Sequence, residues 1–227
     1  RFLLAACPAV FFLRAPKVPW QLYLAYGMTI SVGQFAFLFS AIHVGMPSGL
    51  ASLVLQSQAF FTMLFAALWL KESWRSSQLV GLLLAACGLA LIGSAHGVSM
   101  PLLGFLLTVA AASLWAAGNI VTRAVAACGP INQLAFVVWA SLVPPLPFLA
   151  LSLLIEGRSA RRPALGDFSL RSFAAVAYLA WAATLLGYSL WTRLLSRYPA
   201  NQVAPFSLLV PVVGLTTGWL VFDESLR

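Results

Sequence analysis

The sequence predicts an all-α protein: a polytopic membrane helix bundle with an inverted five-plus-five helix repeat, here truncated to about eight helices. Three observations predict this fold. The 227 residues are 62% hydrophobic and only 8% charged, whereas soluble domains are roughly 45–50% apolar and about 25% charged. The apolar residues form runs that are long enough to cross a bilayer, and the two halves of the chain share a pattern. This composition excludes an intrinsically disordered chain and argues strongly against a soluble globular enzyme.

Eight apolar runs follow one another along the chain. A bilayer core about 30 Å thick requires roughly 20 apolar residues in a helix. Barrel strands are disfavoured because lipid-facing and lumen-facing residues alternate in them. The first run is too short to cross the bilayer, so we expect that the chain lacks preceding residues. The runs cover residues 2–13, 20–44, 48–70, 78–93, 102–121, 132–155, 173–195 and 202–222. Prolines are expected to kink the sixth and eighth runs, at Pro144, Pro145, Pro147, Pro205 and Pro211.

The charges predict how these runs cross the membrane. Thirteen Lys and Arg residues against five Asp and Glu residues give a formal net charge of +8. The positive charges lie in small groups between the runs, which is typical of loops that orient membrane helices and not of a nucleic-acid-binding surface. Alternate loops lie on one side, and the more basic set is assigned to the cytoplasm. That set holds Arg14, Lys17, Lys71, Glu72, Arg75, Arg123, Arg193 and Arg197, and the other holds Glu156, Arg158, Arg161, Arg162, Asp167 and Arg171.

A shift of 152 residues brings the two halves of the chain into register. Pro47 then falls on Pro199 and Glu72 falls on Glu224, and both runs close with Glu-Ser-x-Arg. A proline is tolerated at a helix start because its missing N–H would have no partner there. We therefore expect two repeats, residues 1–97 without their first helix and residues 98–227 without their last. An odd number of crossings in each repeat inverts the second copy, which is a common construction of secondary transporters.

Three stretches resemble the EamA-type members of the drug/metabolite transporter superfamily, and among them the bacterial O-acetylserine/cysteine exporters. They are PKVPWQLYLAYGMTISVGQFAFLFSAIHVGMPSGLASLVLQSQAFF, SLWAAGNIVTRAV and VAPFSLLVPVVGL, and the resemblance extends along essentially the whole chain. It implies ten helices in two inverted repeats of five. It also implies a multi-pass protein of the bacterial inner membrane that exports small metabolites, here amino-acid metabolites similar to O-acetylserine or cysteine.

The candidate site residues are polar and aromatic side chains inside the runs. Polar groups in a membrane are costly, so they usually face a cavity or one another. All five acids lie at the ends of runs or in loops. The substrate-binding candidates are Gln34, Gln56, Trp115, Asn119, Tyr188 and Trp191, and the gating or charge candidates are Arg123 and His43. For each amide, a hydrogen bond between helices is an equally good interpretation, and we expect Gln58 to have that role.

These residues suit an amino-acid zwitterion. Aromatic faces can attract an ammonium group, and amides can hold a carboxylate or an acetyl oxygen. No spacing indicates a metal or a cofactor, and the embedded residues lack the paired acids or buried base that an enzyme would need. We therefore expect a secondary transporter that works by alternating access, with a small-molecule metabolite and the lipid bilayer as partners and no nucleic acid. A passive metabolite channel and a nontransporting scaffold subunit are the alternatives, and a homo-oligomer is left open.

Overall fold

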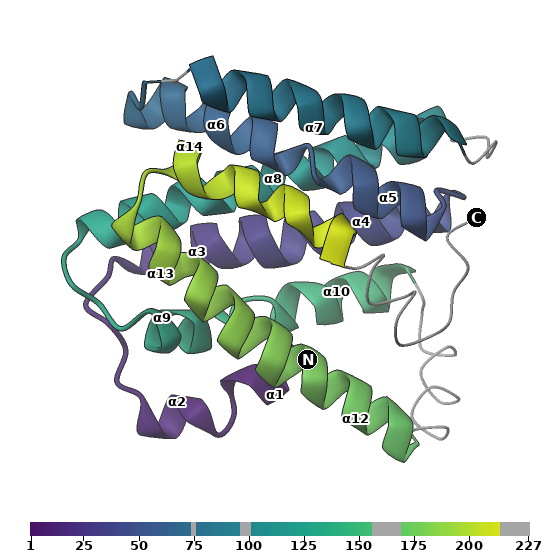
Figure 1. Cartoon of the computed structure of the whole chain (residues 1–227). Coiled ribbons are helices and arrows are strands. Elements are labelled where there is room, and N and C mark those ends of the chain that lie inside the picture. Colours follow the sequence, from purple (N-terminus) through teal and green to yellow (C-terminus); the bar gives the residue numbers. More distant parts are fainter. Residues whose placement is uncertain (74–75, 96–100, 156–168, 214–227) are drawn as a thin grey trace. The chain divides into compact units, whose positions relative to one another are not determined.

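The computed structural model describes residues 1–73, 76–95, 101–155 and 169–213 of the chain (Figure 1). These residues form helices joined by short turns, with no strand anywhere among them. The all-α prediction is therefore confirmed. Several predicted features lie outside the described residues, namely Arg75, His96, Glu156 to Asp167, and the end of the eighth run with Glu224.

Five helical stretches are long and apolar enough to cross a membrane. They are Trp20–His43, Ser48–Leu70, Leu102–Ala127, Gln133–Leu153 and Leu170–Arg197. Three shorter apolar helices cover Phe2–Phe12, Gln78–Gly88 and Ala200–Val213. The order and bounds of these eight stretches follow the eight apolar runs of the sequence. The polytopic membrane bundle is therefore confirmed.

Most of the runs consist of two or three consecutive segments rather than one regular helix. The first three runs form α1 (Phe2–Ala6) with α2 (Ala9–Phe12), then α3 (Trp20–Tyr26), η1 (Gly27–Gly33) and α4 (Gln34–His43), then α5 (Ser48–Leu55) with α6 (Gln58–Leu70). The fourth and fifth runs are α7 (Ser76–Ala95) and α8 (Leu102–Ala127). The last three form α9 (Gln133–Ala140) with α10 (Pro145–Ile155), then α12 (Leu170–Tyr178), η2 (Leu179–Tyr188) and α13 (Ser189–Arg197), then α14 (Ala200–Val203) with η3 (Ala204–Leu208).

Prolines account for some of these breaks. In the sixth run, α9 ends at Ala140 and α10 starts at Pro145, where a missing N–H costs nothing because the first turn of a helix leaves its N–H groups unpaired. In the eighth run, Pro205 lies in the 3₁₀ segment η3. The break between α5 and α6 contains no proline and was not expected. There the amides of Gln56 and Ser57 bond carbonyls three residues back, which tightens the helix locally.

Two π-helical segments support the internal repeat. η1 starts at Gly27 and η2 starts at Leu179, and these positions are related by the same shift of 152 residues that aligns Pro47 with Pro199. Pro47 and Pro199 are themselves the residues that precede α5 and α14. A π-helical turn holds more residues than an α-helical turn and changes the direction of the side chains that follow it. The second and seventh runs therefore share a backbone irregularity that the sequence pattern alone did not predict.

The described helices group into two compact units, each of which takes segments from both halves of the sequence. One unit contains Arg1–Val32 and Val121–Arg197, and the other contains Gly33–Ile120 and Tyr198–Arg227. This grouping is spatial, whereas the predicted boundary between residues 97 and 98 follows the sequence repeat. The boundary stays a prediction.

Helix α9 lies at the core of the first unit, where it contacts α1, α2, α3, η2 and α13. Its residue Phe136 is fully buried, and its ring lies 5.1 Å from that of Tyr23 and 5.0 Å from that of Tyr26. Gly27 allows η1 to approach the turn between α9 and α10 closely, since a Cβ atom there would lie 2.6 Å from the Cβ of Val143. Aromatic packing and one small residue thus hold the second and sixth runs together.

Small apolar residues form the core of the second unit. One cluster joins Ala59, Met63, Leu82 and Ala204, and a second joins Ala41, Met46 and Ala51. A third joins Leu55, Ala111 and Ala112. Alanine at these contacts lets helix backbones approach closely, as is common between helices in membranes.

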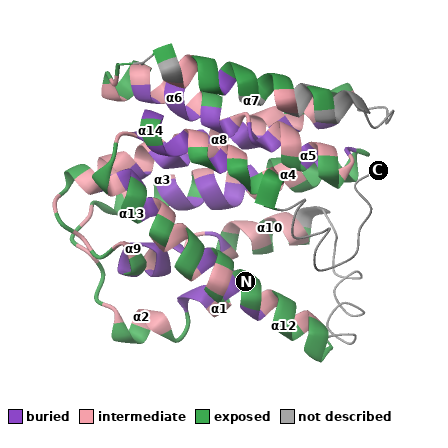
Figure 2. Ribbon diagram, in the orientation of Figure 1, coloured by how far each residue is buried: buried purple, intermediate pink, exposed green. Residues whose placement is uncertain are grey.

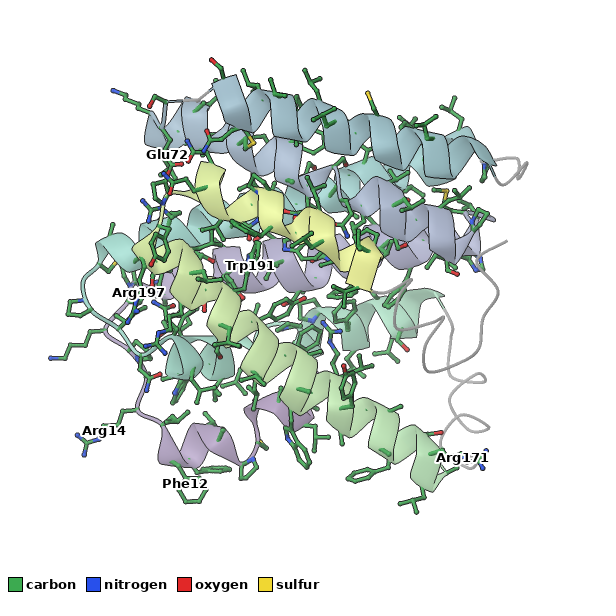
Figure 3. The ribbon with its side chains drawn as sticks, in the orientation of Figure 1. Phe12, Arg14, Glu72, Arg171, Trp191 and Arg197 are labelled. Carbon is green, nitrogen blue, oxygen red and sulfur yellow. The ribbon has the colours of Figure 1, made fainter. Side chains whose placement is uncertain are left out.

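Many large apolar side chains are exposed, and Figure 2 shows exposed residues along most of the helices. Phe12 is 82% exposed and points away from the ribbon in Figure 3, and Leu170 is 83% exposed. So much exposed apolar surface would be unfavourable in water, and soluble proteins rarely expose large apolar patches. Acyl chains are as apolar as these side chains, so the exposure pattern fits the membrane location that the composition predicts.

Candidate functional site

A network of buried polar side chains joins three helical runs of the second unit. Asn119 of α8 donates from Nδ2 to Oε1 of Gln58 at 3.2 Å and to Oγ1 of Thr62 at 3.0 Å. Gln58 in turn donates from Nε2 to Oγ of Ser207 in η3. Gln58, Thr62 and Asn119 are fully buried, and Ser207 is almost so. The amides therefore hold α6, α8 and η3 together, and Gln58 makes the kind of helix-joining bonds that the sequence analysis expected of it.

Asn119 belongs to this network, which bears on its predicted role. Both hydrogens of its Nδ2 group have acceptors on α6, so this amide nitrogen is committed to holding α8 against α6. The structure thus gives Asn119 a structural partner that helical spacing alone could not reveal. Its role in substrate binding stays a prediction.

Three other candidates of the second unit have buried polar atoms that lack a hydrogen-bond partner among the described residues. These atoms are Oε1 of Gln34, Oε1 of Gln56 and Nε1 of Trp115. The side chains of Gln34 and Gln56 are only 2% and 3% exposed. Leaving a buried polar atom unpaired costs about 1–3 kcal/mol, so such atoms in a native structure call for an explanation, such as a water molecule or a ligand.

Two of these residues are related to one apolar cluster. Trp115 and Leu38 pack against the cluster of Leu55, Ala111 and Ala112. Gln34 lies one helical turn before Leu38 in α4, and residues four apart share a helix face. Gln56 directly follows Leu55 in the chain. The second unit thus contains two buried amide acceptors and one buried indole donor without partners among the described residues, groups that suit a small ligand with both polar and apolar parts.

The remaining candidates are distributed over both units. Tyr188 and Trp191 lie in the first unit, are partly buried and belong to η2 and α13. Arg123 of α8 donates from Nη1 to the carbonyl oxygen of Leu195 at 2.9 Å, where a cation is favoured by the partial negative charge at a helix C-terminus. His43 ends α4 in the second unit and is exposed. The roles proposed for these four residues stay predictions.

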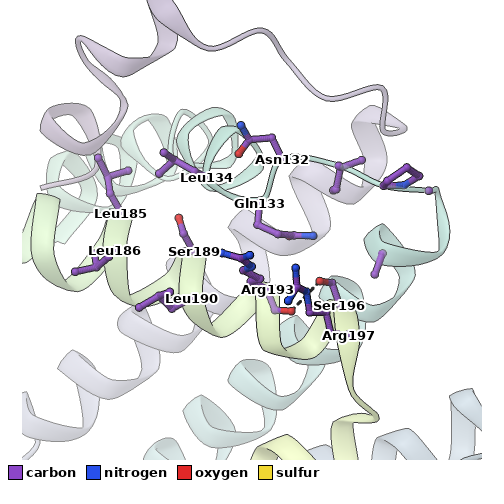
Figure 4. A pocket seen from close by; sticks show the side chains of 14 residues that line it. Asn132, Gln133, Leu134, Leu185, Leu186, Ser189, Leu190, Arg193, Ser196 and Arg197 are labelled. Atoms are coloured by element: carbon purple, nitrogen blue, oxygen red, sulfur yellow. Dashed lines mark hydrogen bonds between the residues drawn. The ribbon is translucent and has the colours of Figure 1, made fainter.

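A cavity in the first unit was not predicted. It has a volume of about 660 Å³ and lies between η2 and α13 on one side and the start of α9 on the other (Figure 4). Oε1 of Gln133 and Oγ of Ser189 line it and are buried without a hydrogen-bond partner among the described residues. The sequence shows only that Ser189, Arg193 and Arg197 lie four residues apart and so share a helix face. This spacing does not reveal the second segment that completes the cavity.

A second feature that the sequence analysis missed is the contact of Glu72 with the start of α14. Its two carboxylate oxygens accept hydrogen bonds from the backbone N–H groups of Ala200 and Asn201, each at 3.1 Å. Asn201 completes the contact by donating from Nδ2 to the carbonyl oxygen of Ser73 at 2.8 Å. Figure 3 shows Glu72 near the end of α6. The sequence showed the repeated Glu-Ser-x-Arg and the repeated proline. It did not show that Glu72 caps the helix that follows Pro199.

The side chains with unpaired buried atoms described above are uncharged, which limits the chemistry that they can perform. Across the described ranges, no group of three or more His, Cys, Asp or Glu residues is arranged to hold a metal ion. What the arrangement offers is hydrogen bonding and apolar contact.

The comparison with protein families decides which kind of membrane protein this is. The model of the EamA-like transporter family matches residues 1–94 and again residues 102–227. The chain belongs to the EamA-like transporter family. Membership makes it a transporter of the drug/metabolite superfamily and a multi-pass membrane protein, and it indicates transport rather than catalysis.

Relatives and a solved structure agree with the family. The chain is 48% identical over 229 residues to a "Probable amino-acid metabolite efflux pump" of Salmonella typhimurium and 45% identical to a protein of the same name in Escherichia coli K12. Each match covers 100% of this chain and 77% of the relative. A crystal structure with 18% sequence identity matches 100% of this chain and 78% of its own with a TM-score of 0.80, which shows that the fold is shared.

Proposed function

We propose that the protein is a secondary transporter of the bacterial inner membrane that exports small amino-acid metabolites, similar to O-acetylserine or cysteine, by alternating access. The EamA-like family supports metabolite transport, and the two bacterial relatives named as amino-acid metabolite efflux pumps support the direction and the substrate class. The observation that carries the proposal in this chain is the set of three buried polar atoms of the second unit without a partner among the described residues, on Gln34, Gln56 and Trp115.

The chemistry of these atoms complements a zwitterion. The Oε1 atoms of Gln34 and Gln56 are acceptors and suit the N–H groups of an ammonium, whereas Nε1 of Trp115 is a donor and suits a carboxylate or an acetyl oxygen. The indole ring adds a face that attracts a cation. Because none of the three side chains proposed for this site is a carboxylate, binding of the ammonium is expected to be weak, and weak binding suits an exporter that meets an abundant cytoplasmic substrate.

The other candidates have supporting roles in this proposal. Asn119 fixes α8, which carries Trp115, through its bonds to α6. Tyr188 and Trp191 offer further aromatic surface in the first unit, and we propose Arg123 and His43 as charges that respond to the alternation between states. Each role can be tested by its own substitution.

An efflux assay on the full-length protein tests the site. We expect Gln34→Leu, Gln56→Leu and Trp115→Phe each to reduce export of labelled O-acetylserine or cysteine about tenfold or more, since each removes a hydrogen bond that a site of this size cannot replace. Ser52→Ala is a matched control, because Ser52 is exposed one turn before Gln56 and bonds only the carbonyl of Gly49 in its own helix. Wild-type export by all three variants would overturn the site.

Reconstituted vesicles separate the proposed carrier from the two alternatives. A carrier that works by alternating access accelerates the uptake of labelled substrate when unlabelled substrate is present on the opposite side of the membrane. A passive channel gives flux without this stimulation, and a nontransporting scaffold subunit gives no flux. Stimulated exchange is the expected result, and either of the other results would replace the proposed mechanism.

A further inference from the structure

We propose that the cavity of the first unit is a binding site for an anionic phospholipid, whose phosphate lies at Arg193 and Arg197 and whose acyl chain lies along the leucines of η2, α13 and α9. This inference does not rest on the proposed export function. It depends on three properties of the cavity: its charge, its apolar wall and its place at one end of a membrane span.

The charge of the cavity is positive. Arg193 and Arg197 both line it and are both exposed, and none of the lining residues that the structure describes is acidic. The two arginines lie four residues apart in α13, so they share a helix face and repel each other. An anion bound between them removes that repulsion and accepts charge-assisted hydrogen bonds from two guanidinium groups, which suit phosphate oxygens.

Uncharged donors and acceptors surround the same end of the cavity. Oγ of Ser189 and Oε1 of Gln133 are buried there without a partner among the described residues, and Figure 4 shows both on the cavity side of their helices. Ser189 lies one turn before Arg193 on the same face of α13. A headgroup that carries hydroxyls beside its phosphate, such as glycerol, could bond both atoms at once.

The opposite part of the cavity is apolar and open. Leu186, Leu190 and Leu134 line it and are 60%, 51% and 39% exposed. Leu186 and Leu190 precede the arginines along the span Leu170–Arg197, and Leu134 follows the start of α9. All three leucines therefore lie deeper in the membrane than the arginines. A soluble anion would leave this apolar wall in contact with water, whereas an acyl chain would cover it.

The cavity therefore has the order of groups that a phospholipid has, with charge at the membrane surface and apolar surface below it. Basic pockets between membrane helices are known binding places for anionic headgroups. In the orientation that the charge distribution predicts, this end of α13 faces the cytoplasm, so the site would take a lipid from the cytoplasmic leaflet.

The test uses purified full-length protein and counts bound phospholipid by native mass spectrometry during titration with phosphatidylglycerol or phosphatidylcholine. We expect phosphatidylglycerol to bind more tightly and to raise the thermal stability. We expect Arg193→Gln with Arg197→Gln to weaken its binding about twenty-five-fold, since each basic residue near an anionic membrane surface contributes about fivefold. Arg14→Gln with Lys17→Gln is the matched control, because it removes two exposed positive charges of a loop that does not line the cavity.

Two further measurements keep the test decisive. Leu190→Trp fills the apolar part of the cavity without changing its charge, and it should weaken phosphatidylglycerol binding even if the double arginine variant does not fold. Glycerol phosphate supplies the headgroup without the acyl chain and should not raise the thermal stability at the same concentration. Equal loss in the control variant, equal binding of the two lipids, an unaffected Leu190→Trp variant, or full stabilisation by glycerol phosphate would each overturn the proposal.

Discussion

Gln56 and Gln58 are two residues apart in one apolar run, yet their surroundings differ. Gln58 is bonded to Ser207 and accepts from Asn119 and Thr62, whereas Oε1 of Gln56 is buried without a partner among the described residues. The tightened turn at Gln56 and Ser57 separates the two side chains onto different faces. The same residue type therefore has a structural role at one position and is available for a ligand at the other.

Replacing glutamine by leucine should change the free energy of unfolding differently at the two positions. Gln58→Leu should lower the free energy of unfolding by about 1–2 kcal/mol, because it leaves buried partners on α8 and η3 without their bonds. Gln56→Leu should leave stability unchanged within about 0.5 kcal/mol or raise it, since it removes a buried unpaired acceptor. Thermal unfolding of the full-length protein in detergent measures both. An equal loss at the two positions would show that Gln56 also joins helices.

Among the helical elements, the contact between the end of α6 and the start of α14 depends on one carboxylate. Glu72 accepts from two backbone N–H groups that an isolated helix start would leave unpaired. The positive end of the helix dipole favours its negative charge as well. Within the second unit, this links the third and eighth runs, which the sequence pattern identifies as repeat partners.

We predict graded losses when this cap is weakened. Glu72→Gln keeps one acceptor oxygen but loses the charge and should lower stability by about 1 kcal/mol, and Glu72→Ala loses both oxygens and should cost up to about 2 kcal/mol. The neighbouring exposed residue provides a control, because Lys71→Gln also removes one charge but leaves both bonds of Glu72 to the start of α14 in place. Chemical unfolding curves of the three variants would contradict the capping role if Lys71→Gln were the most damaging.

The π-helical segment η1 and the turn before α10 can pack closely because Gly27 has no side chain. Gly27→Ala should destabilise the protein by about 1–3 kcal/mol, because its Cβ would lie 2.6 Å from that of Val143 and one backbone would have to move. Gly49→Ala is the control, since no atom lies within 4 Å of the Cβ it would add. If the melting temperatures of the two variants changed equally, the close approach would not matter for stability.

For the whole molecule, the distribution of basic loops predicts the orientation in the membrane. Cys128 is exposed and lies directly after α8, in a loop that the charge distribution assigns to the cytoplasm together with Arg123. In a protein that carries Cys7→Ser and Cys87→Ser, we expect a membrane-impermeant maleimide to label Cys128 only after the cells are permeabilised. Labelling in intact cells would reverse the assigned orientation.

The candidate site could be predicted in part, because helical spacing tells which residues share a face but not what lies opposite that face. Spacing selected Gln34, Gln56 and Trp115, which each have a buried polar atom without a partner among the described residues. It could not show that Asn119 is bonded to α6, since its partners lie 57 and 61 residues away in the chain. It also gave no sign of the cavity near Arg193, because a cavity is made by two segments and neither contains it alone.

The sequence by itself determined that this chain is helical, that it is a membrane protein and in what order its apolar runs follow one another. The physical reason is that lipid offers no hydrogen bonds to the backbone, so long apolar runs must satisfy their own N–H and C=O groups as helices. Only the tertiary structure decided which polar groups pair, where runs tighten or widen into 3₁₀ and π segments, and that Glu72 caps α14. These features depend on contacts between segments far apart in the sequence. The residues on one face of a helix do not identify the segment that packs against it.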